Sequence, residues 1–230
     1  MKGDKKFQHI AAWLAILALP LAYANVGLAL LAIDFDLTAF ADTTHGFQLA
    51  AGHPSGVELM RWSMITDLLG FYLLLVPLAL VLWDWLKKYS PQFTRFFTVF
   101  GLGYLFFGAM GAAILSVIAP QQVQSYAQAA GAEAQVYQAV LLAFSNAIYD
   151  GVWGTLNPLL AGVWWVGIGW LLRRERRALG WGTIVLGIFM LLRDIKFGPI
   201  ELIGLAVYFV LAPIWAAWLG VALLRKPEEG

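Results

Sequence analysis

Five residues in one apolar stretch of the sequence are of the right types and spacing to line a binding site. Asn146, Asp150, Gly154 and Asn157 follow one another at intervals of four, four and three residues, and Tyr149 lies beside them. At 3.6 residues per turn these four positions fall on one face of a helix. We expect this stripe to begin at the outer surface of the protein and to run inward.

A second, shorter stripe of the same kind is formed by Ser63, Asp67 and Gly70. Arg61 and Arg193 are expected at a similar depth, and charged groups inside an apolar segment are functional hypotheses by default. Two interpretations stay open. Asp67 and the aspartate of the first stripe either pair with the arginines as a structural clamp, or form a polar pocket, open to the outside, in which an unpaired carboxylate could carry protons.

The predicted ligand-binding residues come from these two stripes and from the charged turn that follows residue 192. They are Arg61, Asp67, Asn146, Tyr149, Asp150, Asn157, Arg193 and Asp194. No catalytic residue and no cofactor can be assigned from them.

Several kinds of functional site can be excluded because the sequence lacks the residues that they require. The sequence has no cysteine, and its three histidines, His9, His45 and His53, offer no pair at matching depth on facing helices for a haem. The spacing of His45, His53 and the nearby aspartates matches no metal-ligand motif, so we interpret them as solvated loop residues and predict no metal site. There is also no H-E-x-x-H, G-x-S-x-G or P-loop motif.

The elements that must position the stripes are membrane helices. Of the 230 residues, 61% are hydrophobic and only 13% are charged, and 15 Lys and Arg against 14 Asp and Glu leave no basic field for nucleic acid. Six segments approach the 20 or so apolar residues that a spanning helix needs. They are residues 9–33, 59–85, 96–119, 136–172, 179–192 and 200–224.

The basic residues predict the orientation of these helices. With six spans, 12 of the 15 Lys and Arg fall in segments on one side, which the positive-inside rule makes cytoplasmic together with both termini. A cleaved signal peptide ending at Ala22-Tyr23-Ala24 is the alternative for the N-terminal segment, but the apolar run continues to Ile33, long enough to span. We therefore predict an all-α transmembrane bundle of six spans in the bacterial inner membrane, forming one domain over residues 1–230. The outside loops would be residues 34–57 and 120–135.

Tryptophans are frequent at the ends of the predicted spans, where an aromatic belt explains them. Trp153, Trp164 and Trp165 instead lie within the stretch 136–172. They could line a site for a lipid, quinone or pigment, and we favour the interpretation that they face lipid.

The run from Arg61 through Asp67-Leu68-Leu69-Gly70, the run Pro77-Leu78-Ala79-Leu80 and the glycine-rich end of the third segment carry a resemblance to a known family. The chain resembles uncharacterised bacterial six-helix membrane proteins that are catalogued only as a domain of unknown function. The resemblance implies an α-helical bundle and names neither a substrate nor a catalytic residue.

Three hypotheses for the function follow. The absence of a catalytic motif and of a soluble domain favours a non-enzymatic membrane protein, either an accessory subunit beside other membrane proteins or a binding protein for a small molecule or lipid. A transporter or channel using Asp67 and Asp150 is the first alternative, weakened because the inner halves of their helices lack polar residues. An intramembrane enzyme acting on a lipid or small apolar molecule is the second.

Overall fold

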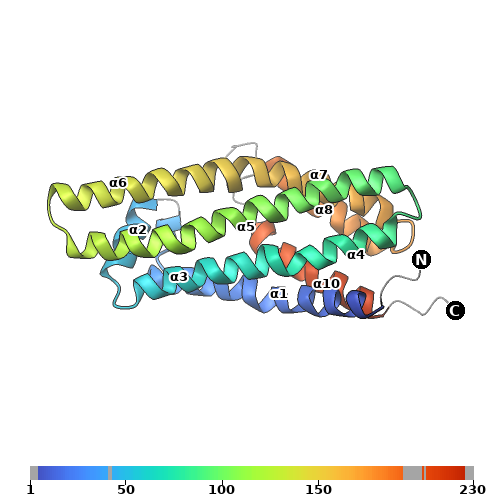
Figure 1. The fold of residues 1–230 in the computed structure, drawn as a ribbon, viewed down its shortest axis with the longest axis horizontal. Coiled ribbons are helices and arrows are strands. Elements are labelled where there is room, and N and C mark those ends of the chain that lie inside the picture. The colour runs from blue at the N-terminus through green and yellow to red at the C-terminus, as the bar shows by residue number, and fades with distance from the viewer. Residues whose placement is uncertain (1–4, 41–42, 194–203, 205, 226–230) are drawn as a thin grey trace.

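The chain folds into an elongated bundle of helices that run nearly parallel to its long axis (Figure 1). The computed structural model describes residues 5–40, 43–193, 204 and 206–225. The α-helices are α1 Lys5–Ala32, α2 Thr43–Gly52, α3 Gly56–Asp67, α4 Val76–Leu86, α5 Pro91–Gln128, α6 Ala132–Asn146, α7 Asn157–Leu172, α8 Arg177–Arg193 and α10 Ala212–Leu224. The prediction of an all-α helical bundle is confirmed.

Five helical segments in the described part of the chain are long and apolar enough to cross a membrane. They are Lys5–Ala32, Gly56–Leu86, Pro91–Gln128, Ala132–Leu172 and Val207–Leu224. The sequence predicted six spans. The segment at 179–192, expected as the fifth, corresponds to α8, whose 17 residues reach about 26 Å at 1.5 Å per residue.

Three of the long segments are continuous helices whose hydrogen-bond pattern changes partway along. π-Helical turns occupy Leu68–Tyr72, Ala147–Leu156 and Val207–Leu211. A regular α-helix begins again after each of them with a proline in its first turn: Pro77 in α4, Pro158 in α7 and Pro213 in α10. Because proline donates no hydrogen bond and its ring crowds the preceding turn, the chain rearranges just before it.

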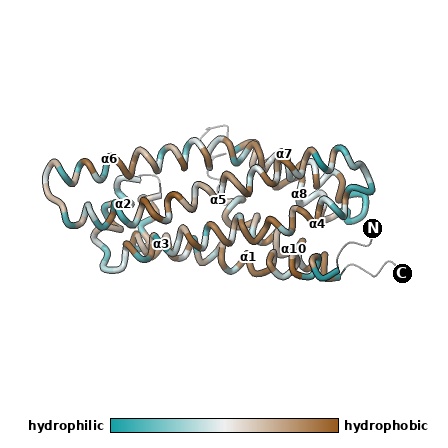
Figure 2. The backbone as a smooth tube through the Cα atoms, in the orientation of Figure 1, coloured by the Kyte–Doolittle hydropathy of each residue, from teal (hydrophilic) through white to brown (hydrophobic). Residues whose placement is uncertain are grey.

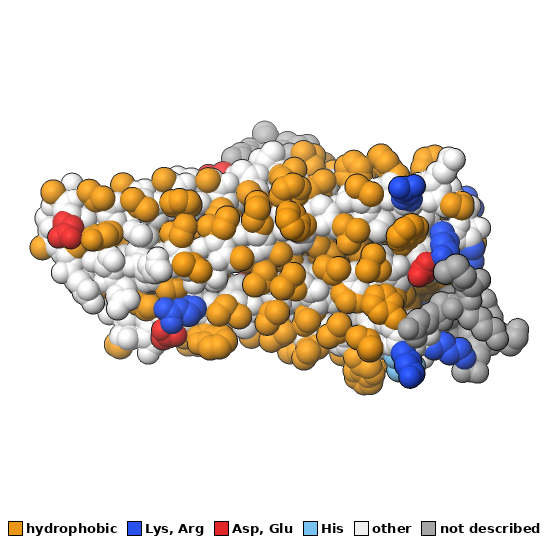
Figure 3. Space-filling view, in the orientation of Figure 1, with side chains coloured by type: hydrophobic (Ala, Val, Ile, Leu, Met, Phe, Trp, Pro, Cys, Tyr) orange, Lys and Arg blue, Asp and Glu red, His pale blue; other side chains and the backbone are white. Residues whose placement is uncertain are grey.

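The two ends of the bundle differ in charge. We call the end where α1 begins and α4, α7 and α10 end the basic end, because Lys87, Lys88 and the turn Arg173–Arg177 lie there. Hydrophilic residues gather at this end of the tube in Figure 2 and blue side chains in Figure 3, whereas apolar side chains cover most of the visible face. The opposite end, the far end, carries α2 and the hairpin between α5 and α6.

The expected outside loop at residues 120–135 is largely helical. Helix α5 continues through Pro120 to Gln128, and α6 starts at Ala132, so only a tight turn separates the two. Pro120 lies inside this helix, which ends at Ala129, a residue in the β region. The hairpin therefore extends the bundle as two paired helices.

The core lies toward the basic end and is built from small residues facing large rings. Helix α1 buries Ala11, Ala15 and Ala22 along one stripe. Trp164 and Trp165 are 0% and 1% exposed, so the interpretation that they face lipid was wrong. They pack inward because small residues on the neighbouring helices leave room for the rings, as Gly101 of α5 does for Trp164.

Candidate functional site

Reciprocal hydrogen bonds between two residues join α1 to α3. The Asn25 side-chain amide donates to the Ser63 carbonyl oxygen at 3.0 Å and to Ser63 Oγ at 3.1 Å. Ser63 Oγ donates to the Asn25 carbonyl oxygen at 3.2 Å, and both side chains are buried. Because these two residues satisfy each other's hydrogen-bonding groups, they hold the helices together and are not candidates for binding a ligand.

Asp67 lies one turn further along the same face of α3 and has no such partner. Its side chain is 5% exposed, and its Oδ2 atom is buried without a hydrogen-bond donor among the described residues. The two arginines that the clamp interpretation paired with Asp67 contact other side chains. Arg61 pairs with Glu58 at 2.7 Å, and the guanidinium of Arg193 lies 5.5 Å from the centre of the Tyr208 ring. Within the part of the chain that the structure describes, no ion pair neutralises Asp67.

Three tyrosine hydroxyl groups meet on the side of Asp67 that faces the basic end. The Tyr208 hydroxyl lies 3.1 Å from that of Tyr72 and 3.3 Å from that of Tyr104. All three side chains are buried, and the Tyr104 hydroxyl also reaches the Phe71 carbonyl oxygen at 3.5 Å. Asp67 lies close enough to the three hydroxyls for an ionised carboxylate there to act on each of them electrostatically. We call Asp67, Tyr72, Tyr104, Tyr208 and Arg193 the Asp67 centre.

Local features of three spans bring these tyrosines together. Tyr72 and Tyr208 both lie in π-helical turns, which are rare and are enriched at functional sites. Tyr104 lies on the regular helix α5, and Gly108, one turn away, gives the Tyr72 ring its space: a Cβ there would overlap the ring. The Trp153 indole donates to the Gly108 carbonyl oxygen at 3.2 Å from the third π-helical turn. All three irregular segments therefore border the same region.

Sequence reasoning did not identify the tyrosines, although a signal was present. Counted from the basic end of their spans, Tyr72, Tyr104 and Tyr208 all lie about 20 to 24 Å along the helix axis. This matching depth on three spans is the signal in the sequence that points to the tyrosines.

The predicted stripe on the fourth long segment does not form a single face. Asn157 is 3% exposed and its Oδ1 atom is buried without a partner among the described residues. Asn146, Tyr149 and Asp150 are exposed instead. The reason is the π-helical turn over Ala147–Leu156: bonding from i to i+5 places more residues in each turn, so positions spaced for an α-helix drift around the axis.

The predicted ligand residues are therefore divided among separate places. Asp67, Asn157 and Arg193 lie within the bundle, Arg61 forms a surface pair, and Asp194 lies outside the described residues. A surface hollow of about 430 Å³ does occur at the far end, between α2 and the hairpin of α5 and α6. None of the predicted ligand residues lines that hollow.

Between the Asp67 centre and the basic end, the interior is filled by indole rings and leucines. The rings of Trp164 and Trp165 lie 6.1 and 5.8 Å from that of Tyr104, and each packs against Trp215. The Trp215 indole donates to Thr183 Oγ1 at 2.8 Å. No polar route leads from the centre to the basic end through these described side chains.

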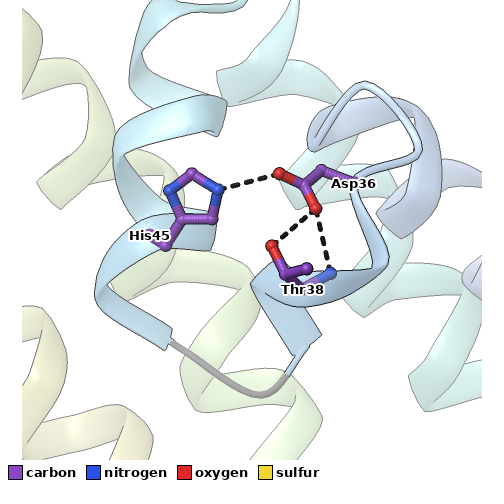
Figure 4. Close-up of polar contacts among 3 residues, drawn as sticks. All are labelled: Asp36, Thr38 and His45. Carbon is purple, nitrogen blue, oxygen red and sulfur yellow. Dashed lines mark hydrogen bonds and ion pairs between the residues drawn. The ribbon is translucent and has the colours of Figure 1, made fainter.

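At the far end, the loop residues expected to be solvated are tied together (Figure 4). Asp36 accepts hydrogen bonds from the Thr38 hydroxyl at 2.6 Å and the Thr38 amide at 2.9 Å, and His45 Nε2 lies 2.9 Å from its other oxygen. The Thr38 hydroxyl and then His45 lower the pKa of Asp36 to about 2. His53 lies 3.7 Å from Asp34 in a second such pair. No group of three metal-ligating side chains occurs among the residues described.

Comparison with known proteins gives one match. The family model "Domain of unknown function (DUF4386)" matches residues 26–226, which is most of the chain. No curated protein and no solved structure matches.

Proposed function

The chain belongs to the DUF4386 family, and we propose that it is a small-molecule-binding protein of the membrane whose ligand site is the Asp67 centre. One observation carries this proposal: Asp67 Oδ2 is buried and has no donor among the described residues. An ionised carboxylate in a low-dielectric interior costs several kcal/mol unless it is paired, so such a group is kept where it has a use.

The chemistry of the centre specifies the class of ligand. A carboxylate oxygen accepts hydrogen bonds, and tyrosine hydroxyls can donate or accept. The rings of Phe71 and Tyr208, stacked 5.0 Å apart and buried, make the surroundings of these polar groups apolar. We therefore expect a small ligand that carries an ammonium group or another hydrogen-bond donor on an apolar body.

Access is proposed from the outer side. Asp67 lies about 28 Å from the end of α4, which is close to the outer boundary of a hydrocarbon core of about 30 Å that starts at the basic end. The indole rings between the Asp67 centre and the basic end block access from that side. Because they also block a conduit through the bundle, we favour binding over transport as the function.

This proposal includes six spans with both termini in the cytoplasm. Helix α8 leaves the basic end and the segment Val207–Leu224 returns to it, so α1 begins and α10 ends on the same side. An even number of crossings is consistent with that arrangement, and α8, at about 26 Å, is nearly as long as the core is thick. The clustered Lys and Arg support a cytoplasmic basic end under the positive-inside rule.

Native isolation tests the proposed function. The wild-type protein and the variants Asp67→Asn and Asp84→Asn would be extracted from their own membrane in mild detergent and analysed for co-purifying small molecules by mass spectrometry. Asp84 is a matched control, because it is an exposed carboxylate already paired with Lys87 at 2.6 Å. We expect one defined amine- or donor-bearing molecule with the wild type and Asp84→Asn, and its loss with Asp67→Asn.

Two results would count against the proposal. Retention of the molecule by Asp67→Asn would show that the Asp67 carboxylate does not hold it. Isolation of the wild type in a stable assembly with other membrane proteins, without a small molecule, would favour the accessory-subunit hypothesis instead.

A further inference from the structure

The turn between α7 and α8 arranges basic and aromatic side chains in alternation. The Arg174 guanidinium carbon lies 5.7 Å from the Tyr89 ring centre and 5.1 Å from that of Trp170. The Arg173 guanidinium carbon lies 5.8 Å from the Trp170 ring centre and 5.6 Å from that of Trp181. We call these five side chains the arginine ladder. It lies at the basic end, where exposed apolar helix surface meets charged turns.

The backbone beneath the ladder is fixed by close contacts between glycines. A Cβ on Gly180 would collide with the backbone of Arg173, and a Cβ on Gly169 would lie 2.8 Å from the Gly180 carbonyl oxygen. Helix α8 therefore starts directly against the end of α7. Since the guanidinium groups also rest on rings, less side-chain freedom remains to be lost when they bind a ligand.

The single acidic residue of the turn is already occupied. Glu175 Oε2 accepts hydrogen bonds from the Trp85 indole at 2.9 Å and the Tyr89 hydroxyl at 3.0 Å, and Lys88 Nζ lies 3.0 Å from it. Partial burial raises the pKa of Glu175, but the bonds from Lys88, Tyr89 and Trp85 lower it more, so it stays below its usual value. Glu175 therefore contacts the ladder only through the Tyr89 hydroxyl, and its ion pair is with Lys88 rather than with Arg173 or Arg174.

The four arginines of the turn have no acidic partner in the part of the chain that the structure describes. No carboxylate among the described residues pairs with Arg173, Arg174, Arg176 or Arg177. Arg173 and Arg174 are exposed, as are their aromatic neighbours Trp170 and Trp181, at 37% and 47%. Planar guanidinium groups match the oxygens of a phosphate, and indole rings favour the boundary between hydrocarbon and headgroups.

We propose that the arginine ladder binds the headgroup phosphate of an anionic phospholipid, held between Arg173 and Arg174 while the acyl chains lie against the exposed apolar faces of α7 and α8. The occupant is a lipid rather than a free anion, because the two arginines are flanked by exposed indoles on helices that border the bilayer. Juxtamembrane basic residues contribute about 1 kcal/mol each toward anionic lipid surfaces.

Retention of lipid by the full-length protein tests this proposal. Wild type, Arg173→Gln/Arg174→Gln and Arg61→Gln would be reconstituted in nanodiscs of phosphatidylcholine mixed with phosphatidylglycerol, and the lipids kept after release would be measured by native mass spectrometry. Arg61 is the matched control, because it lies toward the far end and is paired with Glu58. We expect selective retention of phosphatidylglycerol by wild type and Arg61→Gln. The double variant should lose about 25-fold in this preference, at about five-fold per arginine.

Two further measurements are needed. The first is the unfolding temperature in pure phosphatidylcholine nanodiscs, which should be the same for the double variant and wild type. The second is the retention of phosphatidylglycerol by wild type in the presence of competing inorganic phosphate, which tests the proposal even if the double variant does not fold. Efficient competition by inorganic phosphate would identify a free-anion site and overturn the lipid assignment. Equal retention of the two lipids by wild type would overturn it as well. The variant Asp67→Asn should keep its lipid preference, so this result is independent of the proposed function.

Discussion

Replacing Gly108 by alanine should destabilise the protein by displacing the Tyr72 ring. A Cβ at position 108 would overlap that ring, which is 2% exposed and has no free space into which to retreat. Overpacking of this kind costs about 1 to 3 kcal/mol, and loss of the 3.1 Å contact with the Tyr208 hydroxyl adds about 1 kcal/mol. Alanine regains about 1 kcal/mol through its helix propensity. The net expectation is a loss of about 1 to 3 kcal/mol.

The neighbouring Gly103 provides the control on the same helix. A Cβ there would meet only the Leu160 side chain, at 3.5 Å, which is ordinary van der Waals contact. Gly103→Ala should therefore leave stability unchanged or raise it by up to about 1 kcal/mol. Both variants would be unfolded with denaturant or heat in the same detergent, and the free energies of unfolding compared.

A double-mutant cycle separates the clash from other effects. Tyr72→Leu removes the ring, so Gly108→Ala should cost little in that background. Tyr72→Phe keeps the ring, so the penalty should persist. The explanation would be refuted if Gly108→Ala and Gly103→Ala behaved alike, or if the penalty were the same with leucine as with tyrosine at position 72.

Three further predictions concern other parts of the molecule. Asp67→Asn should raise the free energy of unfolding by about 1 to 3 kcal/mol, because the amide cannot ionise and the carboxyl it replaces is buried without a described partner. An unchanged or lower free energy in denaturant unfolding would contradict this. Asp36 has a pKa lowered from 3.8 to about 2, so its bonds stabilise the fold above pH 4 and are lost as the pH falls through 2. The protection factors of the backbone amides around His45, which correct for the intrinsic exchange rate at each pH, should fall over that range in wild type but not in Asp36→Asn. Equal pH dependence of the protection factors in both proteins would argue against the assignment. Because the chain has no cysteine, Ala130→Cys should react with an impermeant maleimide on intact cells and Gln92→Cys only in inverted vesicles; the reverse pattern would invert the proposed orientation.

Some parts of the candidate site could be predicted from the sequence, and others could not be. The inward direction of Ser63 and Asp67 was predictable, because α3 keeps regular α-helical geometry up to Asp67 and both positions are buried. Gly70 is buried as well, although it lies in the π-helical turn that follows. The stripe from Asn146 to Asn157 was not, because the same spacing argument assumes 3.6 residues per turn where the chain adopts a π-helical turn.

The sequence by itself determined that the chain is an all-α membrane protein of long apolar helices. Composition and the length of apolar runs decide this, because an exposed backbone in hydrocarbon must satisfy its hydrogen bonds within the helix. Only the tertiary structure decided which polar groups meet. One of the two interpretations open from the sequence paired Asp67 with Arg61 or Arg193, but those arginines contact Glu58 and the Tyr208 ring. Which polar side chains contact one another depends on how the helices rotate and cross. Small residues and π-helical turns set this rotation, and they act between segments that are far apart in the chain.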